Sequence, residues 1–222
     1  MSDLAFDIAH LLAGGMLLVS FMLIYQTRLY ALLRSFAIQA LLLAAAVAWQ
    51  AFMRDAPHLL ASAAIALVFK GMIVPWALLR MIDRLGIRRE VETVVGVMPS
   101  MMAGMALVAL SVVLMLQLTA AEASAVARED LAFALSIILL GMLMMVTRRN
   151  AVSQIVGFMS LENGLILAAA GAEGMPFVVE ISVAFSVLIA MIVIGVFLFR
   201  IRERFDSVDT EAIERFRGER NT

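Results

Sequence analysis

Seven long apolar stretches are the feature that most constrains what this chain can fold into. Each is close to the roughly 20 residues that a helix needs to cross the ~30 Å hydrocarbon layer of a bilayer. They lie at about 5–25, 35–53, 59–81, 97–118, 131–147, 151–171 and 177–199. No alternation of apolar and polar residues runs through them, and a backbone in lipid must satisfy its amides within its own segment. The sequence therefore predicts an all-α, polytopic membrane protein with about seven transmembrane helices.

The composition agrees with a membrane protein and excludes several other classes. Hydrophobic residues make up 64% of the chain and charged residues 16%, whereas soluble domains are typically about 45–50% apolar and about 25% charged. A net charge of −1 argues against nucleic-acid binding. Cysteine is absent, and the histidines are His10 and His58, which excludes thiolate chemistry and argues against a multi-histidine metal site. We therefore expect no catalytic residue, metal, cofactor or small-molecule substrate on this chain.

The basic residues are distributed very unevenly between the two sides of the predicted bundle. Loops on the side of the N-terminus contain 2 arginines, and the loops and tail on the other side contain 14. The positive-inside rule then predicts a cytoplasmic C-terminal tail and an N-terminus outside. Asp3 and Asp7 stand where a cleavable signal peptide would carry basic residues, so we expect the first stretch to remain as a transmembrane helix.

A weak internal repeat suggests how the helices are organised. Residues 22–28 resemble residues 142–148, and residues 71–74 resemble residues 190–193, both at an offset near 120. The offset covers four stretches, so two three-helix units would point the same way, as repeats in transport proteins often do; coincidence in a chain rich in Leu, Met and Val is the other reading. The predicted divisions are an N-terminal three-helix unit, a connecting fourth span, a second three-helix unit and a cytoplasmic tail, at 1–96, 97–130, 131–200 and 201–222.

Lys70 is the only lysine in the chain, and it lies near the middle of the third stretch. Its neighbours three, four and seven residues away are apolar, so an ionic partner must come from another helix. An unpaired charge at this depth costs between about 2.5 and 17 kcal/mol, depending on the scale. Two interpretations follow: a station in a proton relay, or a static salt bridge that fixes the order of the helices. Pro75 lacks an amide hydrogen and predicts a local irregularity of the helix close to this charge.

Glu162 lies equally near the middle of the sixth stretch, again on an apolar face. Its depth matches that of Lys70 and its charge is opposite. The two residues are therefore predicted to be neighbours, or to be stations on one water-filled path. A proton-handling role and a structural hydrogen bond are the two interpretations of Glu162.

Four further polar residues lie within the predicted helices. Glu180, about one turn into the seventh stretch, either complements the positive end of the helix or forms an outer station of the same relay. Asn163 and Ser160 are one turn apart and are typical of hydrogen bonds between packed helices. His10 lies close to the outer end of the first stretch, and we interpret it as a residue of the membrane interface.

The C-terminal half of the chain resembles hydrogenase-4 component E, a membrane subunit of group 4 nickel–iron hydrogenases and formate hydrogenlyase-type complexes. The resemblance rests on Arg149-Asn150, Gln154-Ile155, Gly157, Glu162-Asn163-Gly164, Pro176 and Val179-Glu180-Ile181, with Lys70 and Val74-Pro75 matching the motif of the third span. The last three spans are more distantly similar to subunit K of respiratory complex I and to the C component of those cation/proton antiporters that are built of several subunits. That similarity is carried by Arg148-Arg149-Asn150, Gly157, Asn163 and Asp206-Ser207-Val208.

The resemblance implies a non-catalytic subunit of a redox-driven, proton-translocating complex in the bacterial inner membrane. Its partners would be antiporter-like and other membrane subunits, and Lys70, Glu162 and Glu180 would contribute to a proton path. An anchoring subunit of the same complex, or a subunit of a cation/proton antiporter, is the alternative. The chain departs from subunit K where that family has membrane glutamates, which would fall at Met159 and near Met191, and Ser186 stands where some component E sequences have Asp.

Overall fold

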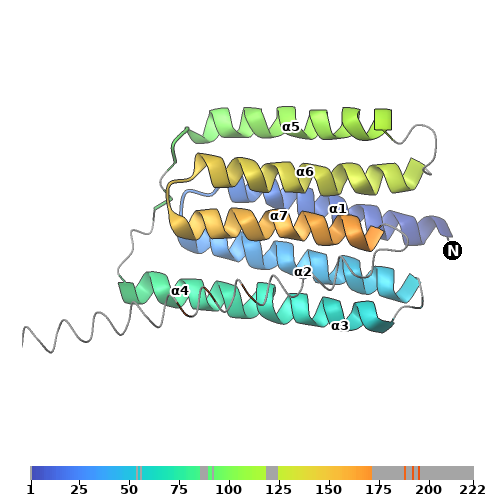
Figure 1. Ribbon diagram of the computed structural model, residues 1–222, viewed down its shortest axis with the longest axis horizontal. Helices are drawn as coiled ribbons and strands as arrows, with labels where there is room; N and C mark the ends of the chain where they lie inside the picture. The colour runs from blue at the N-terminus through green and yellow to red at the C-terminus, as the bar shows by residue number, and fades with distance from the viewer. Residues whose placement is uncertain are drawn as a thin grey trace, which may run out of the picture.

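The computed structural model describes residues 2–53, 55, 57–85, 90–91, 93–118 and 125–171, together with Leu188, Ile192 and Gly195. Within this part of the chain the elements are helices, and they run side by side along one common direction (Figure 1). They are α1 (Ser2–Tyr25), α2 (Leu29–Met53), α3 (Pro57–Ala66), the π-helix η1 (Leu67–Ile73), α4 (Val74–Leu85), α5 (Val97–Leu118), α6 (Ala125–Thr147) and α7 (Ala151–Gly171).

The described residues contain six helical rods that are long and apolar enough to cross a membrane, because α3, η1 and α4 follow one another as a single rod. This confirms the predicted all-α, polytopic membrane fold. The predicted seventh span, 177–199, lies outside the described residues apart from the helical positions Leu188, Ile192 and Gly195.

Two helices begin earlier than the apolar pattern predicted. Helix α2 begins at Leu29 rather than near residue 35, because Leu29, Leu32 and Leu33 are buried and extend its packing surface. Arg34 therefore lies inside the helix rather than in a loop, with its side chain exposed. Helix α6 begins at Ala125 rather than near residue 131, since its first turns contain charged residues that lower the local hydropathy.

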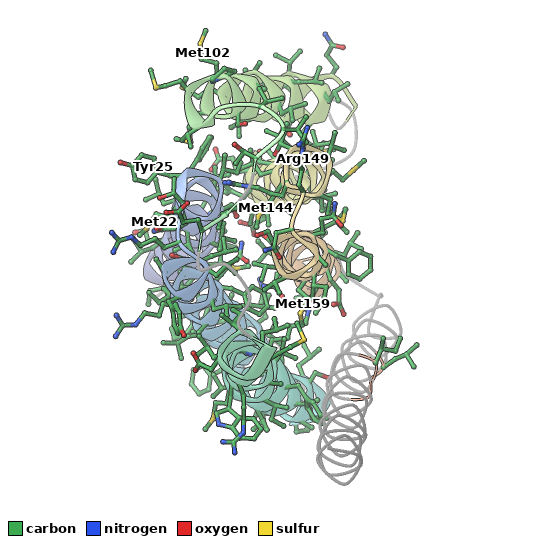
Figure 2. All side chains as sticks on the ribbon, turned by 90° about the vertical axis from the view of Figure 1, so that its left-hand side faces the viewer. Met22, Tyr25, Met102, Met144, Arg149 and Met159 are labelled. Atoms are coloured by element: carbon green, nitrogen blue, oxygen red, sulfur yellow. The ribbon has the colours of Figure 1, made fainter. Side chains whose placement is uncertain are left out.

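The helices are arranged with α5 at one edge and the α3–η1–α4 rod at the other (Figure 1). Helices α1, α2, α6 and α7 lie between these edges, and contacts join α1 to α2 and α6, and α7 to α2 and α6. Viewed from one end, α5 stands apart from the four central helices (Figure 2). Much of its surface is apolar and exposed, as expected for a helix that borders lipid.

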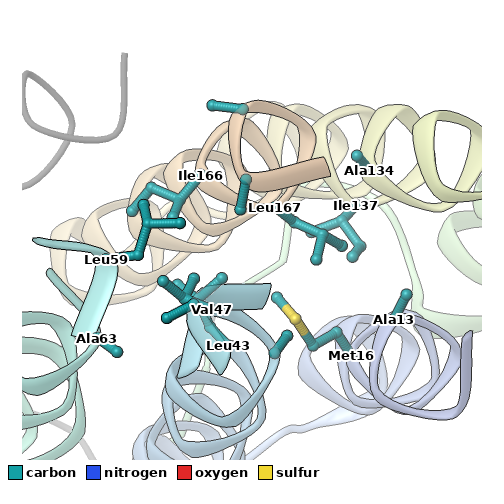
Figure 3. Close-up of a cluster of buried hydrophobic side chains, with 14 residues drawn as sticks. Ala13, Met16, Leu43, Val47, Leu59, Ala63, Ala134, Ile137, Ile166 and Leu167 are labelled. Carbon is teal, nitrogen blue, oxygen red and sulfur yellow. The ribbon is translucent and has the colours of Figure 1, made fainter. Parts of the chain in front are cut away.

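The buried apolar side chains form two separate clusters along the helix axes. The first, at the end where α1 begins, joins Met16 and Leu43 to Ile137 and Ile166, so it draws on α1, α2, α6 and α7 (Figure 3). The second lies toward the other end and contains Leu23, Phe36, Val74, Leu78, Met144 and Met159. The space between the clusters is the middle of the bundle, and there the buried residues are polar.

The second end of the bundle, which we call the arginine-rich end, is closed by one short segment after α4. The amide of Val91 donates to the Thr27 carbonyl at 2.8 Å, and the amide of Val94 donates to the Thr147 carbonyl at 2.8 Å. Thr27 and Thr147 occupy equivalent positions in the repeat at offset 120. The segment thus joins the ends of α1 and α6, which point in the same direction (Figure 1).

Helices α6 and α7 pack backbone against backbone through glycines. A Cβ atom added at Gly141 would lie 2.6 Å from the Leu161 amide nitrogen and 2.8 Å from the Gly157 carbonyl oxygen. One added at Gly164 would lie 2.9 Å from the Ala134 carbonyl oxygen. Small residues permit this close approach between membrane helices, and the contact sets the position of α7, the helix that carries Glu162.

Replacing Gly141 with Ala is therefore expected to destabilise the bundle by about 1–3 kcal/mol, since the added methyl group meets backbone that cannot move aside. The measurement is the unfolding midpoint of the purified protein in detergent. Gly14→Ala is the matched control, because no atom lies within 4 Å of a Cβ at that helical position. An equal midpoint for the two variants would contradict the close contact between α6 and α7.

Candidate functional site

The π-helix η1 places Lys70 inside the bundle. A π-helix is rare and is often found at functional sites; here the Val74 amide donates to the Phe69 carbonyl, five residues back. Pro75, the next residue, has no amide hydrogen to donate. The irregularity predicted from Pro75 therefore takes the form of a widened turn, and Lys70 at its centre has an exposed fraction of 0%.

Lys70 meets Glu162, as the matching depths of the two residues predicted. The Lys70 Nζ atom lies 3.2 Å from Glu162 Oε2, and the side chain of Glu162 is 5% exposed. Lys70 Nζ also donates a hydrogen bond of 2.9 Å to Asn163 Oδ1. Both ionic groups thus have a partner of opposite charge, as buried charges require. A relay and a static salt bridge both need this contact.

The contact continues as a chain of hydrogen bonds across the bundle. Asn163 Nδ2 donates to Gln39 Oε1 at 3.2 Å, and Gln39 Nε2 lies within donating distance of Ser20 Oγ at 2.8 Å and of Ser160 Oγ at 3.0 Å. The Ser20 hydroxyl donates to the Met16 carbonyl at 2.9 Å. Lys70, Glu162, Asn163, Gln39, Ser160 and Ser20, which we call the polar layer, therefore connect η1 to α7, α2 and α1.

The polar layer lies between the two apolar clusters. Along α1, Ser20 stands between Met16 and Leu23; along α2, Gln39 stands between Phe36 and Leu43. All six side chains of the layer are buried. A charge in this layer is therefore separated by apolar side chains from both ends of the helices, and its direct hydrogen-bonded connections run sideways, from one helix to the next.

Sequence reasoning identified part of this layer and missed the rest. It singled out Lys70, Glu162, Asn163 and Ser160, which the structure brings together. It missed Gln39 and Ser20, which carry no charge and so stand out less in an apolar span. Gln39 was nevertheless detectable as a large amide near the middle of the second stretch. The third proton-path candidate, Glu180, lies outside the described residues, as do Pro176, Ser186 and Met191.

The other two residues discussed at the sequence level have clear positions. Met159, where subunit K would have a glutamate, is completely buried in the second apolar cluster (Figure 2). His10 is partly exposed near the beginning of α1, and its Nε2 atom lies 2.8 Å from Glu129 Oε2 and 3.8 Å from Asp130 Oδ1 on α6. The two histidine contacts link α1 to α6 well away from the polar layer.

Arg148 behaves differently from the loop arginine that the charge count assumed. It follows α6 directly at the arginine-rich end, but only 2% of its surface is exposed. Its Nη2 atom donates to the carbonyl of Ile24 in the last turn of α1. Burial lowers the pKa of the Arg148 guanidinium from its usual value. Arg148 thus complements the negative end of the α1 helix, a favourable place for a cation.

We expect Gln39→Leu to destabilise the protein by about 1–3 kcal/mol, because it removes both hydrogen-bonding groups from the centre of the polar layer. Asn163, Ser20 and Ser160 would each lose a buried partner. Gln117→Leu is the control, because Gln117 is exposed on α5. Thermal unfolding in detergent measures the difference, and equal midpoints would show that the layer contributes nothing to stability.

Comparisons with known proteins place the chain in a family. No protein-family model matches it, and no solved structure matches it. It is 30% identical over 209 residues to the Mycobacterium tuberculosis protein described as "Uncharacterized protein Rv0085", and the alignment covers 92% of this chain and 94% of the relative. An identity of this size along nearly the whole of both chains shows common descent, and the chain therefore belongs to the family of Rv0085.

Proposed function

We propose that this chain is a membrane subunit of a multisubunit, redox-driven, proton-translocating complex, and that Lys70 and Glu162 belong to its proton path. The observation that carries the proposal is the buried Lys70–Glu162 pair, with 3.2 Å between Nζ and Oε2, inside a layer of hydrogen-bonded side chains. Ionisable residues inside a membrane domain are expensive and typically mark ion or proton pathways. The resemblance to hydrogenase-4 component E supports the type of complex.

The arrangement of the layer suggests the direction in which a proton would travel. Apolar clusters separate the layer from both ends of the bundle, whereas hydrogen bonds connect it from η1 through α7 and α2 to α1. A proton loaded on Glu162 would therefore pass sideways, within the plane of the membrane, toward neighbouring antiporter-like subunits. The energy would come from a redox reaction on other subunits, since we expect no cofactor on this chain.

The distribution of charge supports an orientation in the bacterial inner membrane. Arg28 and Arg149 lie with exposed side chains at the arginine-rich end of the bundle, and Arg80 is exposed near the end of α4. The Arg80 guanidinium also lies 5.5 Å from the centre of the Trp76 ring, an arrangement suited to a membrane interface. We therefore place this end, and the C-terminal tail, on the cytoplasmic side.

An anchoring subunit is the second candidate, and the geometry of the same pair favours it too. In that role Lys70 and Glu162 would form a permanent ion pair that fixes η1 against α7. The double variant Lys70→Glu with Glu162→Lys separates the two functions. It should restore assembly of the complex if the pair is only structural, whereas a proton relay would remain inactive because both groups have exchanged their positions.

Membership of the complex is tested by affinity purification of the tagged full chain from native membranes. The proposal predicts that antiporter-like subunits and the large and small subunits of a nickel–iron hydrogenase co-purify in fixed proportion. Recovery with antiporter subunits alone would favour the cation/proton antiporter instead. Recovery of the chain alone, in a form that moves a solute by itself in proteoliposomes, would overturn the proposal.

A further inference from the structure

A cavity of about 350 Å³ lies between α1, α5 and α6, away from the polar layer. Leu17 of α1, Val108 and Val112 of α5, and Ala132 and Phe133 of α6 are among the residues that line it, and Glu129 contributes a carboxylate. Cavities of this volume with mainly apolar walls are the usual form of a ligand site. We infer that this cavity binds one acyl chain of a phospholipid whose head group carries a primary ammonium, which pairs with Glu129.

The shape of the cavity fits a chain that enters from the lipid. The lining residues of α6 run from Glu129 to Ser136, about 10 Å along a helix that rises 1.5 Å per residue. The cavity is thus elongated along the helix axes, which is also the direction of acyl chains in a bilayer. Val112 lines the cavity and is also 43% exposed, so the cavity borders the outer surface of α5.

The polar end of the cavity selects the head group. The Glu129 side chain is 64% exposed, and Glu129 lies in the first turns of α6, near the end of the bundle opposite the arginines. His10 Nδ1 lies 2.9 Å from the Phe6 carbonyl, so this nitrogen carries the hydrogen. Its Nε2 atom faces two carboxylates, those of Glu129 and Asp130. Among the described side chains the polar end therefore has more negative than positive groups.

This charge argues for an ammonium and against other amphiphiles. An anionic head group would meet two carboxylates, whereas lipid sites for anionic head groups are basic. A quinone head group offers only hydrogen-bond acceptors, and a carboxylate cannot donate to them. The Ser136 hydroxyl donates to the Ala132 carbonyl at 2.7 Å, so its hydrogen is already in use. A primary ammonium supplies both positive charge and donors, which makes charge-assisted hydrogen bonds to Glu129.

The test is a competition between two lipids with identical acyl chains. The purified full chain in detergent is mixed with equal amounts of dioleoyl phosphatidylethanolamine and dioleoyl phosphatidylglycerol, and native mass spectrometry measures the lipid that remains bound. We expect about a tenfold preference for phosphatidylethanolamine, the size of effect that one charge-assisted hydrogen bond provides. Equal retention of both lipids, or retention of neither, would overturn the inference.

Two variants separate the head-group contact from the acyl cavity. Glu129→Gln should abolish the preference without lowering the total lipid retained, and the exposed Glu90→Gln is its control. Ala132→Phe should fill the cavity and lower retention of both lipids, whereas Ala109→Phe, at an exposed position of α5, should not. If Ala132→Phe does not fold, Val108→Phe serves in its place. Wild-type retention in both cavity-filling variants, or wild-type preference in Glu129→Gln, would contradict the site.

Discussion

Glu162→Gln is expected to lower proton translocation by the assembled complex about tenfold or more, the lower range for loss of a positioned proton-transferring group. The glutamine keeps the size of the side chain and an oxygen that can accept from Lys70, and Asn163 remains bonded to the same ammonium. Assembly should therefore be unaffected. The measurement is proton uptake or release by the complex in proteoliposomes, relative to the electrons transferred.

The control for this variant is Glu90→Gln, which removes an exposed carboxylate outside the spans. It should leave translocation at the wild-type level. A Glu162→Gln complex that translocates protons as well as the wild type would rule out a relay through Glu162 and would leave only the structural role of the pair.

Lys70→Met is expected to produce the largest loss of stability. It leaves the Glu162 carboxylate buried without the ammonium that lies 3.2 Å away, and breaking a buried ion pair from one side typically costs about 3–5 kcal/mol. The variant should yield little assembled protein. Arg34→Met removes a cation whose side chain is exposed on α2, and its yield should be close to that of the wild type.

The double variant Lys70→Met with Glu162→Gln should recover much of the lost yield. With both charges removed, no uncompensated charge remains in the bundle, and such replacements of a whole ion pair are often neutral. The yields are compared by quantitative blotting of membranes and by size-exclusion chromatography in detergent. A double variant that is as poorly assembled as Lys70→Met would show that the lysine supports the fold by some contact other than its pairing with Glu162.

The all-α membrane fold could be predicted because apolarity over about 20 residues admits only a helix. Lys70 and Glu162 could also be identified, since a full charge at mid-span is conspicuous in any apolar stretch. Gln39 and Ser20 could not be placed in the site, because their role depends on which helices are neighbours. The α6–α7 contact through Gly141 and Gly164 has the same origin, since a glycine in a helix does not show what approaches it.

The local departures from prediction have physical causes as well. Pro75 indicated an irregularity near Lys70, but its form as the π-helix Leu67–Ile73 depends on how the backbone pairs, here through Val74 and Phe69. Arg148 was counted as a loop cation because it follows an apolar span. The structure buries it against the last turn of α1, a contact between residues more than 120 positions apart that no local pattern could show.

The measurement that tests the central claim most directly is the number of protons translocated per electron by the complex with Lys70→Met and Glu162→Gln combined. This variant removes both charges of the polar layer while avoiding a lone buried charge. We predict that it assembles and transfers electrons, but that proton translocation falls about tenfold or more, as for the single glutamine variant. Assembly together with the wild-type ratio of protons to electrons would contradict the account, because the pair would then hold the helices together and carry no protons.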